Sequence, residues 1–134
     1  MAEKLHFSLV SPDRELFSGE VDHVVAPGTE GEFGVLPRHA PFMATIKPGP
    51  LRILNDGGER RIFVNGGFAD VTPDGLTVLA EDAVDLADID MARLEQDLTD
   101  AREDVADAGE DAPKKAAAQK KLTRLEAIRA SMGR

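Results

Sequence analysis

The chain contains no cysteine, tryptophan or tyrosine among its 134 residues, and its aromatic residues are six phenylalanines. Without cysteine it has no disulfide, no thiol nucleophile and no cysteine-ligated zinc site. So few aromatic rings also argue against a platform on which nucleic-acid bases stack. Structure and function must therefore come from aliphatic packing, backbone geometry and charge.

Basic residues are scarce relative to acidic ones: 16 Lys and Arg stand against 25 Asp and Glu, for a net charge of −9. This balance disfavours nonspecific nucleic-acid binding. No apolar run approaches the ~20 residues that span a bilayer, and the first residues lack the basic and apolar regions of a signal peptide. We expect a cytoplasmic chain that reaches a membrane only through other proteins, and the initial methionine favours a bacterial protein.

Signals for catalysis and metal binding are also missing. No Gly-x-Ser-x-Gly elbow occurs, and the serines have no triad context. The three histidines (His6, His23 and His39) share no ligand spacing, so we expect no metal site. Acidic pairs are frequent simply because acids are abundant. The sequence predicts a chain that is not an enzyme by itself.

Residues 1–86 have the pattern of a β domain. Leu5, Phe7 and Leu9 alternate with polar residues, as in a half-buried strand. Further short apolar runs follow at Val21–Ala26, Phe42–Ile46, Leu51–Leu54, Ile62–Val64, Phe68–Val71 and Leu76–Ala80. Turn signals rich in Gly, Pro, Asn and Asp separate these runs. About ten short strands in a β-sandwich are predicted.

Residues 87–134 follow a helical period instead. Apolar residues recur every three or four positions in two stretches, interrupted by a Gly-Glu-Asp-Ala-Pro segment at 109–113. The stripes are Met91, Leu94, Leu98, Ala101, Val105 and Ala108, then Ala118, Leu122, Leu125, Ile128 and Met132. A short connection favours an antiparallel two-helix hairpin. The fold class is therefore α+β, with the β-sandwich first and the hairpin second.

Charge in the hairpin is sorted by helix. Residues 88–112 hold ten acids and two bases, a net charge of −8, and residues 113–134 hold seven bases and one acid, a net charge of +6. Opposite helices attract, but each exposed pair contributes only ~0–1 kcal/mol. With narrow, alanine-rich stripes, the hairpin is expected to be closed yet weakly held, so an acidic partner can compete for the basic helix.

A loop dense in glycine and proline, residues 28–41, is the most distinctive segment. Its three glycines mark tight turns or positive φ, and Glu30, Glu32 and His39 lie among them. No lysine or hydroxyl follows the glycines as in a phosphate-binding loop, and the local charge would repel phosphate. We expect the loop to offer a shaped, acidic surface to another molecule.

Five segments together resemble one family. They are Val10–Gly19, Gly28–Pro41, Ile46–Gly49, Asn65–Phe68 and Leu76–Ala80. Their residues and order, with a helical hairpin after them, resemble the ε subunit of bacterial F-type ATP synthases over nearly the whole chain. The Gly-Glu-x-Gly-x-x-Pro-x-His-Ala-Pro core is the most specific part, while the helical half matches in architecture and charge more than in motif.

The resemblance implies a non-catalytic rotor subunit of the central stalk that couples proton-driven c-ring rotation to ATP synthesis. It implies a peripheral location on the cytoplasmic face of the bacterial inner membrane and three partners: the γ subunit, the c-ring and the α/β catalytic head. The segment that would meet the ring comprises Glu30, Gly31, Glu32, Phe33 and His39.

The resemblance also implies a regulatory hairpin. In its extended form the basic helix approaches acidic segments of the catalytic β subunits and blocks hydrolysis. The residues that would serve this role are Lys114, Lys115, Lys120, Lys121, Arg124 and Arg129.

No cofactor is required, but some family members bind ATP as a regulatory ligand through Ile-Asp-x-x-Arg-Ala and an arginine of the second helix. The matching positions are Ile89, Asp90, Arg93 and Arg124, and Leu94 replaces the small residue of the motif.

Plainer interpretations stand beside these. The loop acids and His39 fit ordinary exposed residues, Asp90 and Arg93 fit a local helix pair, and the basic helix fits a solvated face. A stand-alone β-sandwich that binds a carbohydrate or peptide is the alternative function, although the chain lacks the aromatics of a sugar platform. A small acid–base enzyme is a third possibility, without a cleft signature.

Overall fold

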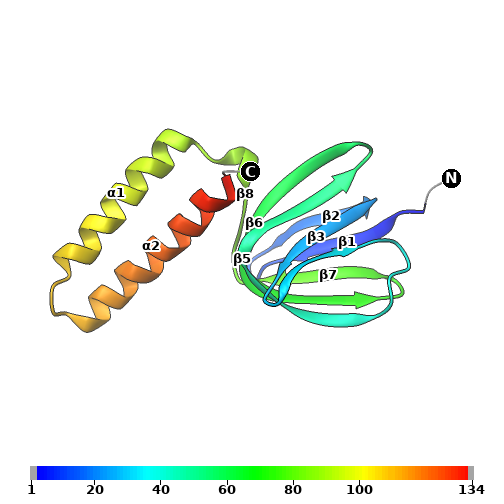
Figure 1. Cartoon of the computed structure of the whole chain (residues 1–134), viewed down its shortest axis with the longest axis horizontal. Helices are drawn as coiled ribbons and strands as arrows, with labels where there is room; N and C mark the ends of the chain where they lie inside the picture. Colours follow the sequence, from blue (N-terminus) through cyan, green and yellow to red (C-terminus); the bar gives the residue numbers. More distant parts are fainter. Residues whose placement is uncertain (1–2, 133–134) are drawn as a thin grey trace. The chain divides into compact units, whose positions relative to one another are not determined.

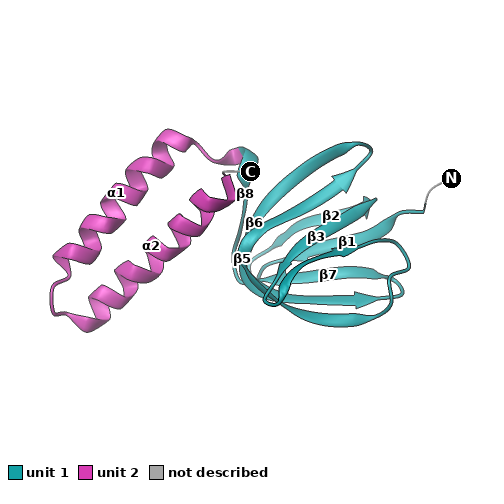
Figure 2. Ribbon diagram, viewed as in Figure 1, with its two compact units in different colours: residues 1–87 teal, residues 88–134 magenta. Residues whose placement is uncertain are grey.

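A computed structural model describes residues 3–132, so Arg134, one of the basic residues counted above, lies outside it. The chain divides into two compact units, residues 1–87 and 88–134 (Figure 2). The first unit contains the strands and the second the two helices (Figure 1). In chain order the described elements are β1 (Leu5–Val10), β2 (Glu15–Val21), β3 (His23–Gly28), β4 (Gly31–Val35), β5 (Phe42–Asn55), β6 (Gly58–Thr72), β7 (Gly75–Ala80), β8 (Ala83–Asp85), the 3-10 helix η1 (Leu86–Asp88), α1 (Met91–Asp107) and α2 (Ala112–Met132).

The strands of residues 3–87 form one sheet that curves round on itself (Figure 1). Their order is β2-β1-β7-β6-β5-β3-β4, and β8 pairs with β6. Strands β1 and β7 run parallel, with Phe7 opposite Leu76, whereas β5 and β6 form a long antiparallel ribbon. The alternation predicted for β1 is confirmed, because Leu5, Phe7 and Leu9 are all buried in the core.

The expected number of about ten strands is wrong for the described residues, which contain eight. Two pairs of predicted strands are each one continuous strand: Phe42–Ile46 joins Leu51–Leu54 within β5, and Ile62–Val64 joins Phe68–Val71 within β6. The Gly and Pro signals between them bend the ribbon without ending its pairing. The two long strands therefore serve both layers of the sandwich.

Glycine is required at the bend of β6. Gly66 and Gly67 have φ values of 86° and 144°, which side chains with a Cβ rarely adopt. A Cβ on Gly67 would lie 2.1 Å from the carbonyl oxygen of Leu79 on β7. Across this bend the buried positions of β5 shift from even residues, such as Ile46, to odd ones, such as Leu51. The face of the ribbon that points into the core is therefore different on the two sides of the bend.

Helix α1 begins at a conventional cap. Asp90 precedes the helix, and its Oδ1 accepts hydrogen bonds from the backbone N–H groups of Ala92 and Arg93 at 2.9 and 3.2 Å. After α1 ends, Gly109 takes a positive φ of 57°. The boundary predicted from the glycine is confirmed.

Helix α2 starts after Asp111, whose Oδ1 accepts a hydrogen bond from the backbone N–H of Lys114 at 3.1 Å. Within the second unit, an ion pair joins Arg129 of α2 to Glu95 of α1. Most of the predicted stripe is buried, whereas Met91 at the start of α1 is 38% exposed. The buried apolar residues of the two helices are Leu94, Leu98, Ala101, Leu122, Leu125 and Ile128, and Ala108 directly after α1 is buried as well.

Lys4 connects three segments of the sandwich. Its Nζ lies 2.7 Å from Asp22 Oδ1 between β2 and β3, and it donates hydrogen bonds to Asn55 Oδ1 at 2.6 Å and Asp56 Oδ1 at 2.9 Å in the β5–β6 turn. The backbone N–H of Asp56 donates to Asp22 Oδ2 at 2.8 Å. The hydrogen bonds from Lys4 and from the Asp56 backbone lower the pKa of Asp22, and Asp22 and then Asp56 raise the pKa of Lys4.

We predict that Lys4→Met lowers the melting temperature in a pH-dependent way. The Asp22 carboxylate has a lower pKa when folded, so its contribution is present above the unfolded pKa of about 4 and is lost as the pH falls below it. Lys4 has a raised pKa when folded, so its contribution is lost only as the pH rises beyond about 10.5. The difference from wild type should be greatest between about pH 5 and 9 and shrink toward pH 3.

Melting curves from pH 3 to 9 provide the measurement, with Lys47→Met as the control, since Lys47 is an exposed lysine on β5. A difference between wild type and Lys4→Met that does not change with pH would contradict the electrostatic account.

Candidate functional site

The tip of the glycine-rich loop is a tight connection between β3 and β4. Gly28 pairs with Gly31, whose φ is 128°, and the backbone N–H of Thr29 donates to the carbonyl oxygen of Thr45 at 3.0 Å. This leaves the side chains of Glu30 and Glu32 exposed. Strand β4 has β3 as its neighbour and lies at the end of the strand order, so these acids stand at a sheet edge.

An aromatic group supports this edge. The rings of Phe33 and Phe42 meet edge to face with centroids 5.4 Å apart, and the His39 ring lies 5.2 Å from that of Phe42. Phe33 also covers Gly28, because a Cβ there would lie 2.9 Å from the Phe33 ring. Two of the residues predicted to form the site, Phe33 and His39, are therefore brought together through Phe42.

Phe42 was missed as a site residue in the sequence analysis. The signal was present, since Phe42 opens an apolar run directly after Pro41. Its partners, however, come from the pairing of β3, β4 and β5, and local spacing does not specify that pairing.

The two predicted acids have different surroundings. Glu30 lies at the exposed turn, whereas Glu32 is close enough to Arg52 of β5 to influence it. The pKa of Arg52 is raised, first by its hydrogen bond with Glu59 and more weakly by the charge of Glu32. Glu30 and Glu32 are both exposed, so both carboxylates are available to a partner.

An apolar row crosses the outer face of the sheet. Val10 of β1 is opposite Leu79 of β7, Leu79 is opposite Phe68 of β6, and Met43 of β5 lies on the same face one step diagonally from Phe68. Leu79 is 53% exposed and Met43 is 65% exposed. We call Val10, Leu79, Phe68 and Met43 the outer apolar row. Side chains in such register form one contiguous surface on which another protein can dock.

The hairpin residues predicted to bind nucleotide take helix-internal roles. Asp90 caps α1, and Arg93 Nε lies 3.4 Å from Asp97 Oδ1 one turn along the helix. Leu94 is buried, so its bulk belongs to the packed side of α1. Ile89 and Arg124 are half-buried. The structure thus gives Asp90 and Arg93 partners within α1.

The basic residues of α2 differ in environment. Lys114, Lys115, Lys120 and Lys121 are exposed, whereas Arg129 pairs with Glu95. Four of the predicted cations are therefore directed to solvent. In the described part of the chain, neither helix is long and apolar enough to span a bilayer.

Comparison with known proteins gives concordant matches. The sequence model of the family described as "ATP synthase, Delta/Epsilon chain, beta-sandwich domain" matches residues 4–86. The ATP synthase epsilon chain of Maricaulis maris is 60% identical over 111 residues, which cover 83% of this chain and 84% of the relative. That of Hyphomonas neptunium is 51% identical over 133 residues, which cover 98% of each.

Two solved assemblies contain chains of the same fold. One is in the Euglena gracilis mitochondrial ATP synthase, with a TM-score of 0.79, 24% identity and coverage of 98% of this chain and 83% of that chain. The other is in the central stalk and c-ring of the Tetrahymena thermophila enzyme, with a TM-score of 0.62, 15% identity and coverage of 98% of each. At these identities the likeness is one of fold. The family model and the bacterial relatives, in contrast, match the sequence itself, and the chain belongs to the ATP synthase epsilon chain family.

Proposed function

We propose that the chain is a non-catalytic rotor subunit of the ATP synthase central stalk and couples c-ring rotation to ATP synthesis in the catalytic head. The observation that carries this proposal is the outer apolar row, an exposed docking surface on a well-packed sandwich. Bacterial relatives that match nearly the whole chain are epsilon chains, which favours this function over a stand-alone adaptor.

The outer apolar row is the surface we assign to the γ subunit. It runs across β1, β7, β6 and β5, which pair with one another through backbone hydrogen bonds. A rotor must transmit torque, and side chains held by four paired strands deform little under load. Fully burying an exposed leucine contributes about 1.5–3 kcal/mol. Leu79 and Met43 are 53% and 65% exposed, so burying the remainder of each contributes roughly half to two thirds of that.

The edge formed by Glu30, Gly31, Glu32, Phe33 and His39 is the surface we assign to the c-ring. Glu30 and Glu32 are exposed, and Phe33 and His39 are fixed through Phe42. An exposed acid at a turn suits a basic residue in a polar ring loop, because complementary charge fixes register and orientation. The membrane location follows from this contact and needs no spanning helix.

The hairpin is the regulatory element of the proposal. The exposed lysines of α2 are available to acidic segments of the catalytic β subunits, with Arg124 and Arg129 on the same helix. To make this contact, Arg129 would break its ion pair with Glu95 and form one with an acidic residue of the β subunit. A partner shifts the hairpin between arrangements only by its differential affinity for them.

ATP is a secondary candidate as a regulatory ligand at Ile89, Asp90, Arg93 and Arg124. For ATP to bind there, Asp90 must go on capping α1, and Arg93 must give up its ion pair with Asp97 to contact the nucleotide. That exchange is inexpensive, because the Arg93–Asp97 pair is exposed. Leu94 is already buried and offers no space for the ligand. No cofactor is needed for the rotor role.

The first prediction from the proposed function concerns the outer apolar row. Leu79→Asp should weaken binding to the purified γ subunit by roughly 10- to 100-fold, because the apolar contact is lost and a charge is buried. Leu36→Asp is the matched control, because Leu36 lies outside the row and its 54% exposure is close to the 53% of Leu79, and it should change affinity far less. Equal losses for the two variants, measured by calorimetry, would refute the assignment.

The second prediction concerns the ring-facing edge. A cysteine at Glu32 should form a cross-link with a cysteine in the polar loop of the c subunit in the assembled synthase. A cysteine at Glu103, an exposed acid of α1, is the control and should not. If linkers of several lengths all fail with Glu32→Cys, the proposed orientation is wrong.

The third prediction concerns the hairpin. Removing residues 89–134 should raise ATP hydrolysis by the assembled enzyme and leave assembly intact, because the sandwich carries both stalk contacts. Replacing Lys114, Lys115, Lys120 and Lys121 with glutamine should raise it in the same direction, whereas Lys47→Gln should not. Unchanged hydrolysis in the truncated enzyme would argue against a brake.

A further inference from the structure

One residue beside the ring-facing edge is held in an unfavourable backbone conformation. Leu36, Pro37, Arg38 and His39 form a turn in which the backbone N–H of His39 donates to the carbonyl oxygen of Leu36 at 3.2 Å. Arg38 has a φ of 63°. Glycine or asparagine usually occupies this position of a turn that has proline before it, because a Cβ there is strained. The chain keeps an arginine where glycine would fit better.

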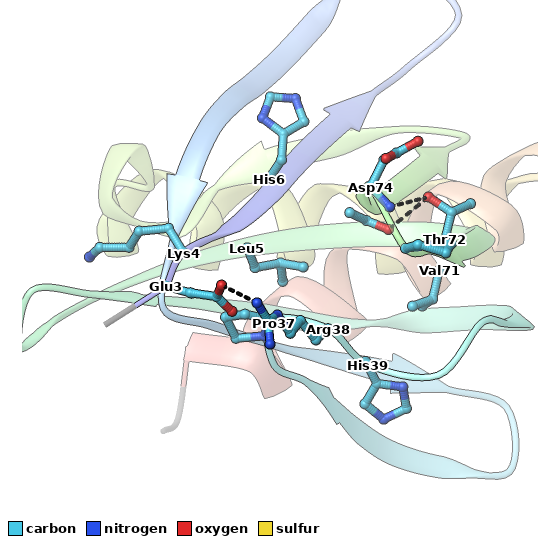
Figure 3. Close-up of a pocket in the computed structure, with 12 residues that line it drawn as sticks. Glu3, Lys4, Leu5, His6, Pro37, Arg38, His39, Val71, Thr72 and Asp74 are labelled. Carbon is cyan, nitrogen blue, oxygen red and sulfur yellow. Dashed lines mark hydrogen bonds and ion pairs between the residues drawn. The ribbon is translucent and has the colours of Figure 1, made fainter. Parts of the chain in front are cut away.

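The turn borders a hollow of about 320 Å³ in the sandwich (Figure 3). Its floor is formed by the buried side chains of Leu5 and Val71. Pro37 and Pro73 also line it, one from each of two turns. The hollow is therefore apolar where Leu5 and Val71 line it and large enough to take a whole side chain. The rest of its lining is mainly polar, with Glu3, Lys4, His6, Arg38, His39, Thr72 and Asp74 around it.

Arg38 stands at the mouth of this hollow with Glu3. Its Nη2 lies 2.7 Å from Glu3 Oε1, and the two side chains are 80% and 54% exposed. An exposed pair of this kind is weakly held and easily exchanged. The planar guanidinium is also well shaped to take a carboxylate through two hydrogen bonds.

The other cations that line the hollow are engaged elsewhere in the sandwich. Lys4 is held by Asp22 and Asp56, and the His6 ring contacts Glu20. His39 Nδ1 lies 2.9 Å from the carbonyl oxygen of Ala40. Among the ion-paired cations of this lining, Arg38 is the most exposed, with 80% of its side chain accessible against 30% for Lys4 and 53% for His6.

We propose that Arg38 binds a carboxylate carried by the polar loop of the c-ring and that this carboxylate takes the place of Glu3. The aliphatic stem of the acidic residue lies over Leu5 and Val71, between the two prolines. The inference rests on the proposed function, because His39 of the ring-facing edge adjoins Arg38. Glu30 precedes β4 and Arg38 follows it, so the loop of residues 28–41 offers a negative contact at one end of β4 and a positive contact at the other, and this polarity specifies how a ring loop must be oriented.

The test measures affinity of the full chain for a detergent-solubilised subcomplex of γ and the c-ring. Arg38→Ala should lose roughly tenfold in affinity, the usual effect of removing a charge-assisted contact, and Arg38→Lys should retain part of it. Glu3→Gln should bind two- to fivefold more tightly, since it removes the competing carboxylate. The double variant that combines Glu3→Gln with Arg38→Ala should bind with the same affinity as Arg38→Ala alone.

The opposite sign of the Glu3 and Arg38 effects is the decisive result. If Glu3→Gln weakens binding as Arg38→Ala does, the Glu3–Arg38 ion pair only stabilises the turn of residues 36–39, and the proposal is overturned. Unchanged affinity in Arg38→Ala overturns it as well. Failure of the wild-type chain to bind the subcomplex would instead refute the proposed function.

Two further measurements separate the alternatives. In the isolated chain, Arg38→Gly should melt roughly 2–6 °C above Arg38→Ala, because both lack the charge and only glycine relieves the strain. Equal melting temperatures would overturn the claim that arginine is kept at a cost. Binding to phosphatidylcholine–phosphatidylglycerol vesicles should not depend on Arg38; if it does, the ligand is lipid phosphate and the carboxylate proposal fails.

Discussion

The contact between Gly67 and the backbone of β7 is the constraint on which the sandwich depends. A Cβ at Gly67 would overlap the carbonyl oxygen of Leu79, so the close approach of these strands exists only with glycine there. The ribbon of β5 and β6 bends at this point, and the bend lets one sheet enclose a core. The same contact places Leu79 beside Phe68 on the outside. Core closure and the outer apolar row thus share one cause.

The two units are stabilised in different ways. Residues 3–87 enclose an extensive apolar cluster and cross-connect their turns through Lys4. Within the second unit, two helices pack through a narrow seam of leucines, alanines and Ile128, with the ion pair of Arg129 and Glu95 alongside. A rigid body and a more weakly held hairpin suit a subunit with one fixed and one adjustable task.

Local patterns in the sequence were sufficient to predict much of this fold. The alternation in β1, the helical stripes, and Gly109 at the end of α1 depend on neighbours in sequence, and each lies where it was expected. The number of strands could not be predicted correctly from these patterns. Gly and Pro residues occur at bends within a strand as well as at the ends of strands, and only the pairing with neighbouring strands distinguishes the two cases. The Glu3–Arg38 pair could not be predicted for a similar reason, because its two residues lie 35 positions apart in the chain. The contact of Phe42 with Phe33 likewise depends on how β3, β4 and β5 pair.

The parallel pairing of β1 with β7 has a consequence for biosynthesis. Phe7 emerges early from the ribosome, yet its neighbour Leu76 follows only after five intervening strands have been made. The sheet cannot close before β7 has been synthesised, so until then the edge of β1 that pairs with β7 has no backbone partner. Forming a contact across so long a loop is also slow. The helices, made last, need only neighbouring contacts and can form as they appear. Nascent chains stalled before Leu76 are therefore the stage at which this protein is most exposed to aggregation and most dependent on chaperones.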